Sequence, residues 1–166
     1  MFYVSAAMNN EQKWIILVDG FQIGESKFVH DRMAAVIDSG CPWIQLSADS
    51  LAEIHQIITP IRFKDGFHYI DCSKRSKLPV IHFLLFGGQR LSLGPEYYVF
   101  KDKTFGLRTE CYLRIRVPTS NSISSPILGI PVLKKYYTVF DEASQRIGFA
   151  PANPDPNNEL SSASVF

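Results

Sequence analysis

The sequence lacks several features that would assign it quickly to a class of protein. No apolar run approaches the roughly 20 residues that a membrane-spanning helix needs. Lys and Arg number 17 and Asp and Glu 16, so no excess charge points to nucleic acid or to an anionic membrane. The N-terminus has neither a basic region nor a long apolar region, so it is not a signal peptide. From this N-terminus alone we expect either an intracellular chain or a piece of a longer protein.

Ligand patterns for metals are missing as well. The sequence has no Cys-x-x-Cys and no His-x-x-x-His pair, so the spacing indicates no zinc site. It has no Gly-x-Ser-x-Gly motif, so a serine hydrolase is not indicated. Its histidines (His30, His55, His68 and His82) are scattered, as is typical of surface or core positions. We therefore expect no metal and no cofactor.

What the sequence does have is a composition suited to one globular domain. It contains 166 residues, of which 46% are hydrophobic. A chain of this length buries roughly 70% of the surface that it exposes when unfolded. One domain is therefore the expectation, formed by residues 1–152, while the Pro-, Asn- and Ser-rich stretch 153–166 reads as a disordered tail.

Most segments have the pattern of strands. Residues 14–18 read as a strand that ends at an Asp19-Gly20 turn, and residues 33–37 read as a strand that is buried on both faces. Two glycines at 87 and 88 join residues 79–86 and 90–93 as a hairpin. Residues 111–117 alternate between apolar and polar side chains, as in a half-buried strand. The expected fold class is all-β.

A single clear helix interrupts the strands at residues 47–58. Leu51, Ile54, Ile57 and Ile58 fall on one helical face. The spacing of Ser50 and Glu53 fits a capping box, and Thr59-Pro60 ends the segment. A second, short helical turn is expected at residues 132–135.

One stretch carries candidate chemistry: an apolar run that delivers Asp38 onto the turn Asp38-Ser39-Gly40. A carboxylate just past a buried strand would be partly desolvated, which allows its proton affinity to be tuned for acid–base work. The tripeptide alone is a weak signal, because Asp-Ser-Gly is more typical of an ordinary turn.

The cysteines leave two interpretations open. Cys72 and Cys111 lie in strand-like stretches and could form a disulfide, while Cys41 adjoins the Asp38 turn. Three reduced cysteines in the core are the alternative, and the composition does not choose between them.

Longer segments resemble the C-terminal lobe of a pepsin-like aspartic protease over nearly the whole chain. WIILVDGFQIG at 14–24 is similar to the entry strands of that lobe, AVIDSG at 35–40 to its catalytic strand and turn, and FHYIDCSKRSKLPVIHF at 67–83 to its cysteine-bearing segment. LSLGPEYYV at 91–99 fits the segment that follows, and PILGIPVLKKYYTVFDEASQRIGFAP at 126–151 resembles the closing strands.

The resemblance implies peptide hydrolysis by two aspartates, one from each lobe, that share a proton across a bound water. Asp38 would be the aspartate of this lobe, supported by Ser39, Gly40 and Cys41 on its own turn. Leu128 and Gly129 would pass behind that turn, and Cys72 and Cys111 match the disulfide of the family. The sequence contains one such Asp-Ser-Gly turn, so the second aspartate must come from an N-terminal lobe or from a second copy of the chain.

The sequence also departs from the family pattern close to Asp38. The family usually has Thr and Ser after the glycine, where this chain has Cys41 and Pro42. A thiol is a weaker donor than a hydroxyl, so it would stabilise the ionised aspartate less. Ile130 stands where many members have an aspartate, and losing that charge would act in the opposite direction.

Two functions follow from the resemblance. The first is an aspartic-type endopeptidase acting on polypeptides, represented here by its C-terminal lobe. The second is a catalytically inactive lobe that acts as a peptide-binding, protein-binding or inhibitory module.

Overall fold

The computed structural model describes residues 1–8, 12–25, 27–102, 109–118 and 125–152, so the expected tail at 153–166 lies outside the described residues. The described chain is built mainly of strands, which confirms the all-β expectation. The strands are β1 (Phe2–Met8), β2 (Trp14–Ile23), β3 (Lys27–Val29), β4 (Met33–Ile37), β5 (Ile44–Gln45), β6 (Arg62–Lys64), β7 (Phe67–Ile70), β8 (Ile81–Leu85), β9 (Arg90–Leu93), β10 (Val99–Asp102), β11 (Glu110–Leu113), β12 (Ile115–Arg116), β13 (Ile127–Leu128), β14 (Tyr136–Asp141) and β15 (Arg146–Pro151). The helices are α1 (Ala48–Ile57), the 3-10 helix η1 (Cys72–Lys77), α2 (Pro95–Tyr98) and α3 (Ile130–Lys135).

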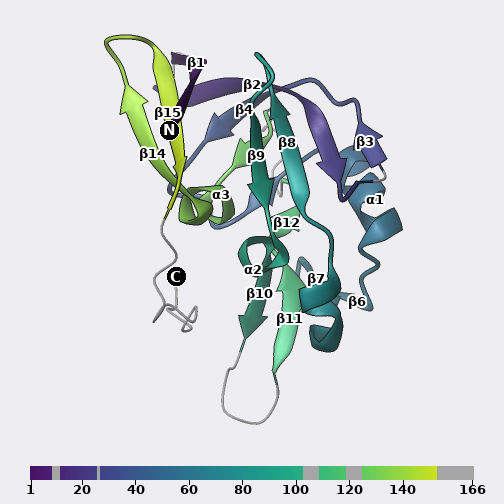
Figure 1. Ribbon diagram of the computed structural model, residues 1–166. Coiled ribbons are helices and arrows are strands. Elements are labelled where there is room, and N and C mark those ends of the chain that lie inside the picture. Colours follow the sequence, from purple (N-terminus) through teal and green to yellow (C-terminus); the bar gives the residue numbers. More distant parts are fainter. Residues whose placement is uncertain (9–11, 26, 103–108, 119–124, 153–166) are drawn as a thin grey trace.

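The strands form two sheets. The larger, 11-stranded sheet contains the path β12-β5-β13-β4-β2-β1-β15-β14; off this path, β3 and β8 pair with β2, and β9 pairs with β8. The smaller, four-stranded sheet has the order β10-β11-β7-β6. Figure 1 shows the hairpin of β14 and β15 at one side of the molecule and β10 and β11 at the lower end. Almost all neighbours are antiparallel; β12 beside β5 and β13 beside β4 are parallel.

The expected turn at Asp19-Gly20 is instead a bulge within one long strand. β2 runs from Trp14 to Ile23, and its register against β8 shifts between Val18 and Gly20. Gly20 has a φ of 152°, and a Cβ at this position would lie 2.3 Å from the carbonyl oxygen of Val29. Glycine therefore lets the strand bend without ending, which the sequence pattern of a strand followed by Asp-Gly does not reveal.

Helix α1 forms where the apolar period predicted it, but it begins with a different cap. The Ser47 side chain accepts a hydrogen bond from the Ser50 N–H at 3.1 Å, so Ser47 is the N-cap and the predicted capping box at Ser50 is wrong. Ser50 is buried inside the helix, and its hydroxyl bonds to Asp31. Of the expected apolar face, Ile57 remains exposed at 36%.

Two strands of the smaller sheet are shorter than their sequence patterns indicate. β7 ends at Ile70, and Cys72 begins η1 rather than completing the strand. The alternating stretch at 111–117 is divided at Arg114, whose N–H donates to the Tyr98 carbonyl at 2.7 Å. The break carries the chain from the smaller sheet at β11 into the larger sheet at β12.

The core lies between the sheets and is filled by large aromatic and aliphatic side chains. Tyr98, Phe21, Phe83 and Phe149 are fully buried. The Tyr98 hydroxyl donates to the Pro79 carbonyl at 2.6 Å, which satisfies the one polar atom of this ring. Burial raises the pKa of Tyr98 far above its ordinary value, so the hydroxyl stays protonated.

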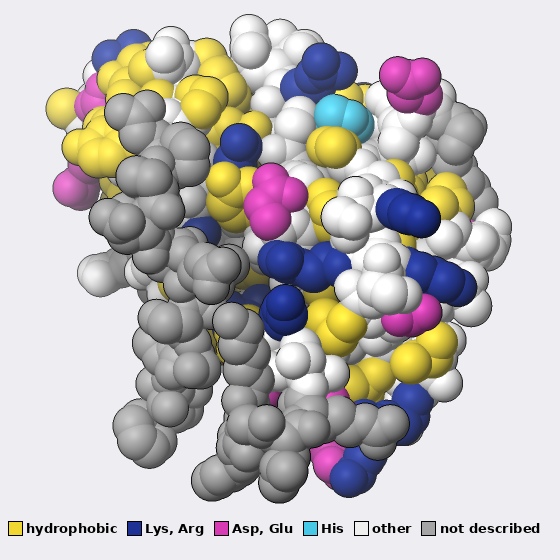
Figure 2. Space-filling model, turned by 60° about the horizontal axis from the view of Figure 1, so that its bottom comes forward, with side chains coloured by type: hydrophobic (Ala, Val, Ile, Leu, Met, Phe, Trp, Pro, Cys, Tyr) yellow, Lys and Arg dark blue, Asp and Glu magenta, His cyan; other side chains and the backbone are white. Residues whose placement is uncertain are grey.

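Charge is spread unevenly over the surface although the formal net charge is only +1. The helices η1 and α3 both pack beside α2 and carry basic residues in their last turns, namely Lys74, Arg75, Lys77, Lys134 and Lys135. Figure 2, which brings the bottom of the molecule forward, shows Lys and Arg side chains across the middle of this face. A balanced composition therefore coexists with one locally basic face.

Candidate active site

The Asp38 turn begins where the central strand β4 ends. The side chain of Asp38 is half-buried, and its Oδ1 accepts a hydrogen bond from the Gly40 N–H at 2.8 Å. The Cys41 N–H donates to the Asp38 carbonyl at 3.4 Å, which closes the turn. The carboxylate is thus held by its own turn and remains open to solvent, as a group that acts on a water must be.

β13 passes directly behind this turn. It pairs parallel with β4, with Leu128 opposite Ile37, and antiparallel with β5, with Leu128 opposite Ile44. The Asp38 N–H points to the Leu128 carbonyl at 3.4 Å. Strand β13 therefore joins the strand before the turn to the strand after it, and fixes where Asp38 leaves the sheet.

Gly129 makes the closest approach to the turn from behind. A Cβ at this position would lie 2.2 Å from the Cys41 carbonyl oxygen and 2.5 Å from the Trp43 carbonyl oxygen. The next residue, Ile130, donates its N–H to the Cys41 carbonyl at 2.8 Å and begins α3. Only a residue without a side chain fits between these backbone groups.

The Cys41 side chain does not support the Asp38 carboxylate in the way that a threonine hydroxyl would. Its Sγ donates to the Trp43 carbonyl at 3.5 Å, and the residue is only 7% exposed. Burial raises the pKa of the Cys41 thiol; the hydrogen bond to Trp43 opposes this, the nearby charge of Asp38 raises the pKa further, and Arg116 has the smallest, opposing effect. The thiol is therefore protonated at neutral pH, which disfavours its use as a nucleophile.

The structure brings most of the sequence-predicted residues together. Asp38, Gly40, Cys41, Leu128 and Gly129 are linked by the backbone contacts described above. Ser39 lies exposed on the same turn.

Sequence reasoning missed Trp43 and Arg116 beside this turn. The Arg116 guanidinium lies 4.5 Å from the centre of the Trp43 ring. The alternation of residues 111–117, which places Arg114 and Arg116 on the polar face, was the signal that could have found this arginine.

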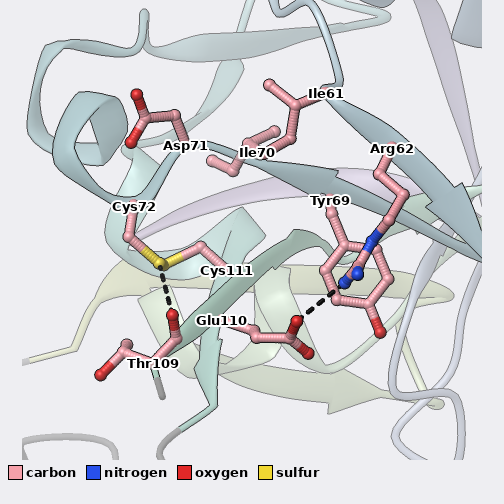
Figure 3. Close-up of a pocket in the computed structure, with 9 residues that line it drawn as sticks. All are labelled: Ile61, Arg62, Tyr69, Ile70, Asp71, Cys72, Thr109, Glu110 and Cys111. Carbon is pink, nitrogen blue, oxygen red and sulfur yellow. Dashed lines mark hydrogen bonds and ion pairs between the residues drawn. A yellow bond between two sulfur atoms is a disulfide. The ribbon is translucent and has the colours of Figure 1, made fainter.

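Cys72 and Cys111 form the disulfide that the resemblance implied, with their Cα atoms 5.3 Å apart. They border a cavity of about 500 Å³ that does not include the Asp38 turn. In Figure 3, Arg62 and Glu110 form an ion pair across it, at 2.8 Å.

Asp71, at the edge of the same cavity, caps η1. Its Oδ1 accepts from the Ser73 hydroxyl at 2.7 Å and from the Ser73 N–H at 2.9 Å. These bonds lower the pKa of the Asp71 carboxyl. The charged groups of this cavity are thus engaged in holding together the smaller, four-stranded sheet (the outer sheet) and η1, which is a structural role.

The described part of the chain holds no cluster of three or more His, Cys, Asp or Glu side chains arranged to bind a metal ion. Within the same residues, none of the helices has the length and apolar character that crossing a membrane requires.

Comparison with known proteins adds three findings. Residues 2–152 match the family model described as eukaryotic aspartyl protease. The chain is 33% identical to cathepsin D of Rattus norvegicus over 145 residues, which is 84% of this chain and 34% of that protein. It is 36% identical to renin of Echis ocellatus over 152 residues, which is 89% of this chain and 36% of that protein.

A solved structure shows the same fold. The aspartic proteinase from Irpex lacteus superimposes with a TM-score of 0.73 over 90% of this chain and 46% of that chain, at 18% identity. The chain spans about a third of the length of the curated relatives that it matches.

Proposed function

This chain belongs to the eukaryotic aspartyl protease family, and on that premise we propose that residues 1–152 form one lobe of a two-lobed aspartic-type endopeptidase. Asp38 supplies one of the two catalytic carboxylates. The observation that carries the proposal is the Asp38 turn with β13 behind it, through Leu128 and Gly129. Its partner is an N-terminal lobe or a second copy of the chain.

The geometry of Asp38 suits a carboxylate that shares a proton with a second one. Two carboxylates about 3 Å apart cannot both be ionised, so one retains a proton. The ionised group takes a proton from the attacking water, and the protonated group donates to the oxygen of the scissile carbonyl. The Gly40 N–H holds Oδ1 of Asp38, which fixes the carboxylate orientation that this exchange needs.

Exposed apolar side chains support the need for a partner. Tyr3 and Met8 on β1, and Tyr137 and Phe140 on β14, are 41–63% exposed. β14 is the last strand of its sheet path, so its outer edge is available to another strand. A lobe that covers these side chains would remove them from water.

The test joins this chain to the N-terminal half of a relative and measures hydrolysis of a protein substrate at acidic pH. We expect cleavage by the joined protein, and a loss of at least about 1,000-fold in Asp38→Asn, because the neutral amide can neither accept nor share the proton. Asp19→Asn, which changes another carboxylate that pairs with Arg32, is the matched control and should keep the activity. Absence of cleavage, or an active Asp38→Asn protein, would overturn the proposal.

One observation favours the second candidate function, a catalytically inactive binding or inhibitory lobe. The Cys41 thiol bonds to the Trp43 carbonyl and leaves the Asp38 carboxylate without the hydroxyl donor that the family pattern supplies. If this candidate is correct, the joined protein binds peptides without cleaving them, and Asp38→Asn leaves that binding intact. Loss of peptide binding in Asp38→Asn would contradict it.

A further inference from the structure

A second cavity, of about 410 Å³, lies between helix α1 and the hairpin of β6 and β7. Ala52 and His55 line it from α1, Phe63 and His68 from the hairpin, and Arg116 from the end of β12. Most of this lining is apolar, and Phe63 is 66% exposed at its rim. The volume falls in the range of about 300–1,000 Å³ that is usual for sites that bind small molecules or side chains.

Arg116 is the fixed charge of this cavity. Its guanidinium lies over the Trp43 ring, 4.5 Å from the ring centre, and its Nε is buried without a hydrogen-bond partner. None of the ion pairs among the described residues involves it. A half-buried guanidinium with an unused donor is costly unless an acceptor reaches it, and a carboxylate is the acceptor that matches its geometry.

The histidines add a hydrogen-bonding group without a second charge. The rings of His55 and His68 lie 4.4 Å apart, and the Phe63 ring lies 4.7 Å from that of His68. Burial lowers the pKa of His55 and of His68, so both are neutral at neutral pH. The Nε2 of His55 is buried and has no partner. The Nε of Arg116 and the Nε2 of His55 are therefore polar atoms without hydrogen-bond partners beside a lining that is otherwise mostly apolar.

The cavity is connected to the Asp38 turn through Arg116. In the sheet, Arg116 lies opposite Gln45 of β5, the strand that follows the turn. Its charge also acts on Cys41, which adjoins the turn. Arg116 therefore links the wall of the cavity to the strand that follows the Asp38 turn.

We propose that the cavity is a distal binding site for a polypeptide segment in which a Glu or Asp lies next to a large apolar residue. The carboxylate pairs with Arg116, and the apolar side chain packs against Phe63 and the α1 face at Ala52. The proposal rests on the function proposed above and specifies its substrate class: polypeptides with an acidic residue away from the cleaved bond.

The test measures binding of fluorescein-labelled peptides to the full chain carrying Asp38→Asn, by fluorescence anisotropy at neutral pH and low salt. The probe has Leu-Phe-Glu at the centre of a Gly/Ser peptide, and its matched control has Leu-Phe-Gln. We expect the Glu peptide to bind about tenfold more tightly, the usual scale of one hydrogen bond to a charged group. Equal affinities would overturn the proposal.

Two variants test the site itself. Arg116→Gln should abolish the preference for Glu, whereas Arg90→Gln, which removes a charge from the exposed start of β9, should keep it. Ala52→Glu places a competing carboxylate at the exposed rim without disturbing the core, and should weaken binding of the Glu peptide by about tenfold. If both Arg116→Gln and Ala52→Glu keep the preference for the Glu peptide over the Gln peptide, the peptide does not bind in this cavity and the proposed site is wrong.

Further outcomes separate this site from the catalytic proposal and from a small-molecule site. Binding of the Glu peptide by a chain whose joined form never cleaves would retain the site and reject the endopeptidase. Cleavage by the joined protein without any preference for Glu would retain the endopeptidase and reject the site. If 3-phenylpropionate binds as tightly as the peptide, the site is one for small apolar acids, and the polypeptide assignment fails.

Discussion

The centre around Asp38 and the outer four-stranded sheet are stabilised by different kinds of contact. At the centre the contacts are between backbone groups: the Leu128 carbonyl faces the Asp38 N–H, and the Cys41 carbonyl accepts from Ile130. Strand pairing with β4 and β5 surrounds them. Such contacts do not depend on which side chain a residue carries, provided that it leaves room for the neighbouring backbone.

In the outer sheet, side chains supply the contacts. The disulfide joins η1 to β11. On one face, the Arg62 guanidinium lies 4.0 Å from the centre of the Tyr69 ring, and that of Arg114 lies 4.3 Å from the centre of the Phe100 ring. The two regions should therefore differ in the changes that they tolerate: added atoms damage the centre, and removed atoms damage the outer sheet.

The largest expected effect comes from adding one methyl group at the centre, in Gly129→Ala. The new Cβ would lie 2.2 Å and 2.5 Å from two backbone oxygens that cannot rotate away. We expect a loss of about 4–5 kcal/mol in the free energy of unfolding, or no folded protein. Urea unfolding followed by circular dichroism measures it.

Gly66→Ala is the matched change in the outer sheet. Gly66 has a φ of 81°, and nothing lies within 4 Å of an added Cβ. The cost is therefore limited to backbone strain of about 1–2 kcal/mol. Equal losses in the two variants would show that the centre is no more tightly constrained than an exposed turn.

The next effect comes from removing side-chain contacts in the outer sheet, in Cys72→Ala combined with Cys111→Ala. The disulfide closes a loop across a sequence separation of 39 residues. Its loss should lower the free energy of unfolding by about 2–4 kcal/mol. Urea unfolding of the double variant measures this, and wild-type protein in reducing agent should behave in the same way.

Cys41 then reports whether the centre survives in that variant. It is the remaining cysteine, it is buried, and its thiol is protonated. In the folded double variant, we expect its reaction with a thiol reagent to stay as slow as in the wild type. Fast labelling in the absence of urea would mean that loss of the disulfide opens the centre as well, and that the two regions are not independent.

How much of the fold could be predicted depends on whether an element is determined by its local sequence or by contacts with distant residues. The hairpin of β8 and β9 and the strand β4 follow from local patterns, so the sequence predicts them without knowledge of distant residues. Strand β1 was not predicted, because FYVSAAM does not alternate regularly and its pairing with β15 joins the two ends of the described chain. The bulge at Gly20 depends on the close approach of Val29, which no local pattern contains.

For the candidate site, the residues came from the resemblance and their geometry from the structure. The Asp38 turn and the Leu128-Gly129 segment could be named from the sequence. The direction of the Cys41 thiol could not, because it depends on where the Trp43 carbonyl lies. The stacking of Arg116 on Trp43 brings together strands that are distant in the sequence, so periodicity could indicate only that the arginine was on the polar face.

The smallest expected effect is a pH dependence that originates in the histidines between α1 and the outer sheet. Burial lowers the pKa of His55 and His68 below the ordinary value of 6.5, and the neighbouring His68 lowers the pKa of His55 further. At a pH just below 6.5 the unfolded chain therefore binds more protons than the folded one. The free energy of unfolding must then decrease as the pH falls from 6.5 towards the pKa values of the folded protein, and level off below them.

His55→Gln combined with His68→Gln should reduce this decrease, because the amide does not titrate. Urea unfolding at a series of pH values on both sides of 6.5 measures it, with the ratio of the wild-type and variant slopes as the result. Some decrease should remain, since burial and Arg90 also lower the pKa of His82 in the larger sheet, and His82→Gln should remove a further part. The rings of His55 on α1 and His68 on β7 are partly exposed to water, so their effect must be smaller than that of the disulfide. A slope that is unchanged in the double variant would mean that His55 and His68 are as easily protonated in the folded chain as in the unfolded one.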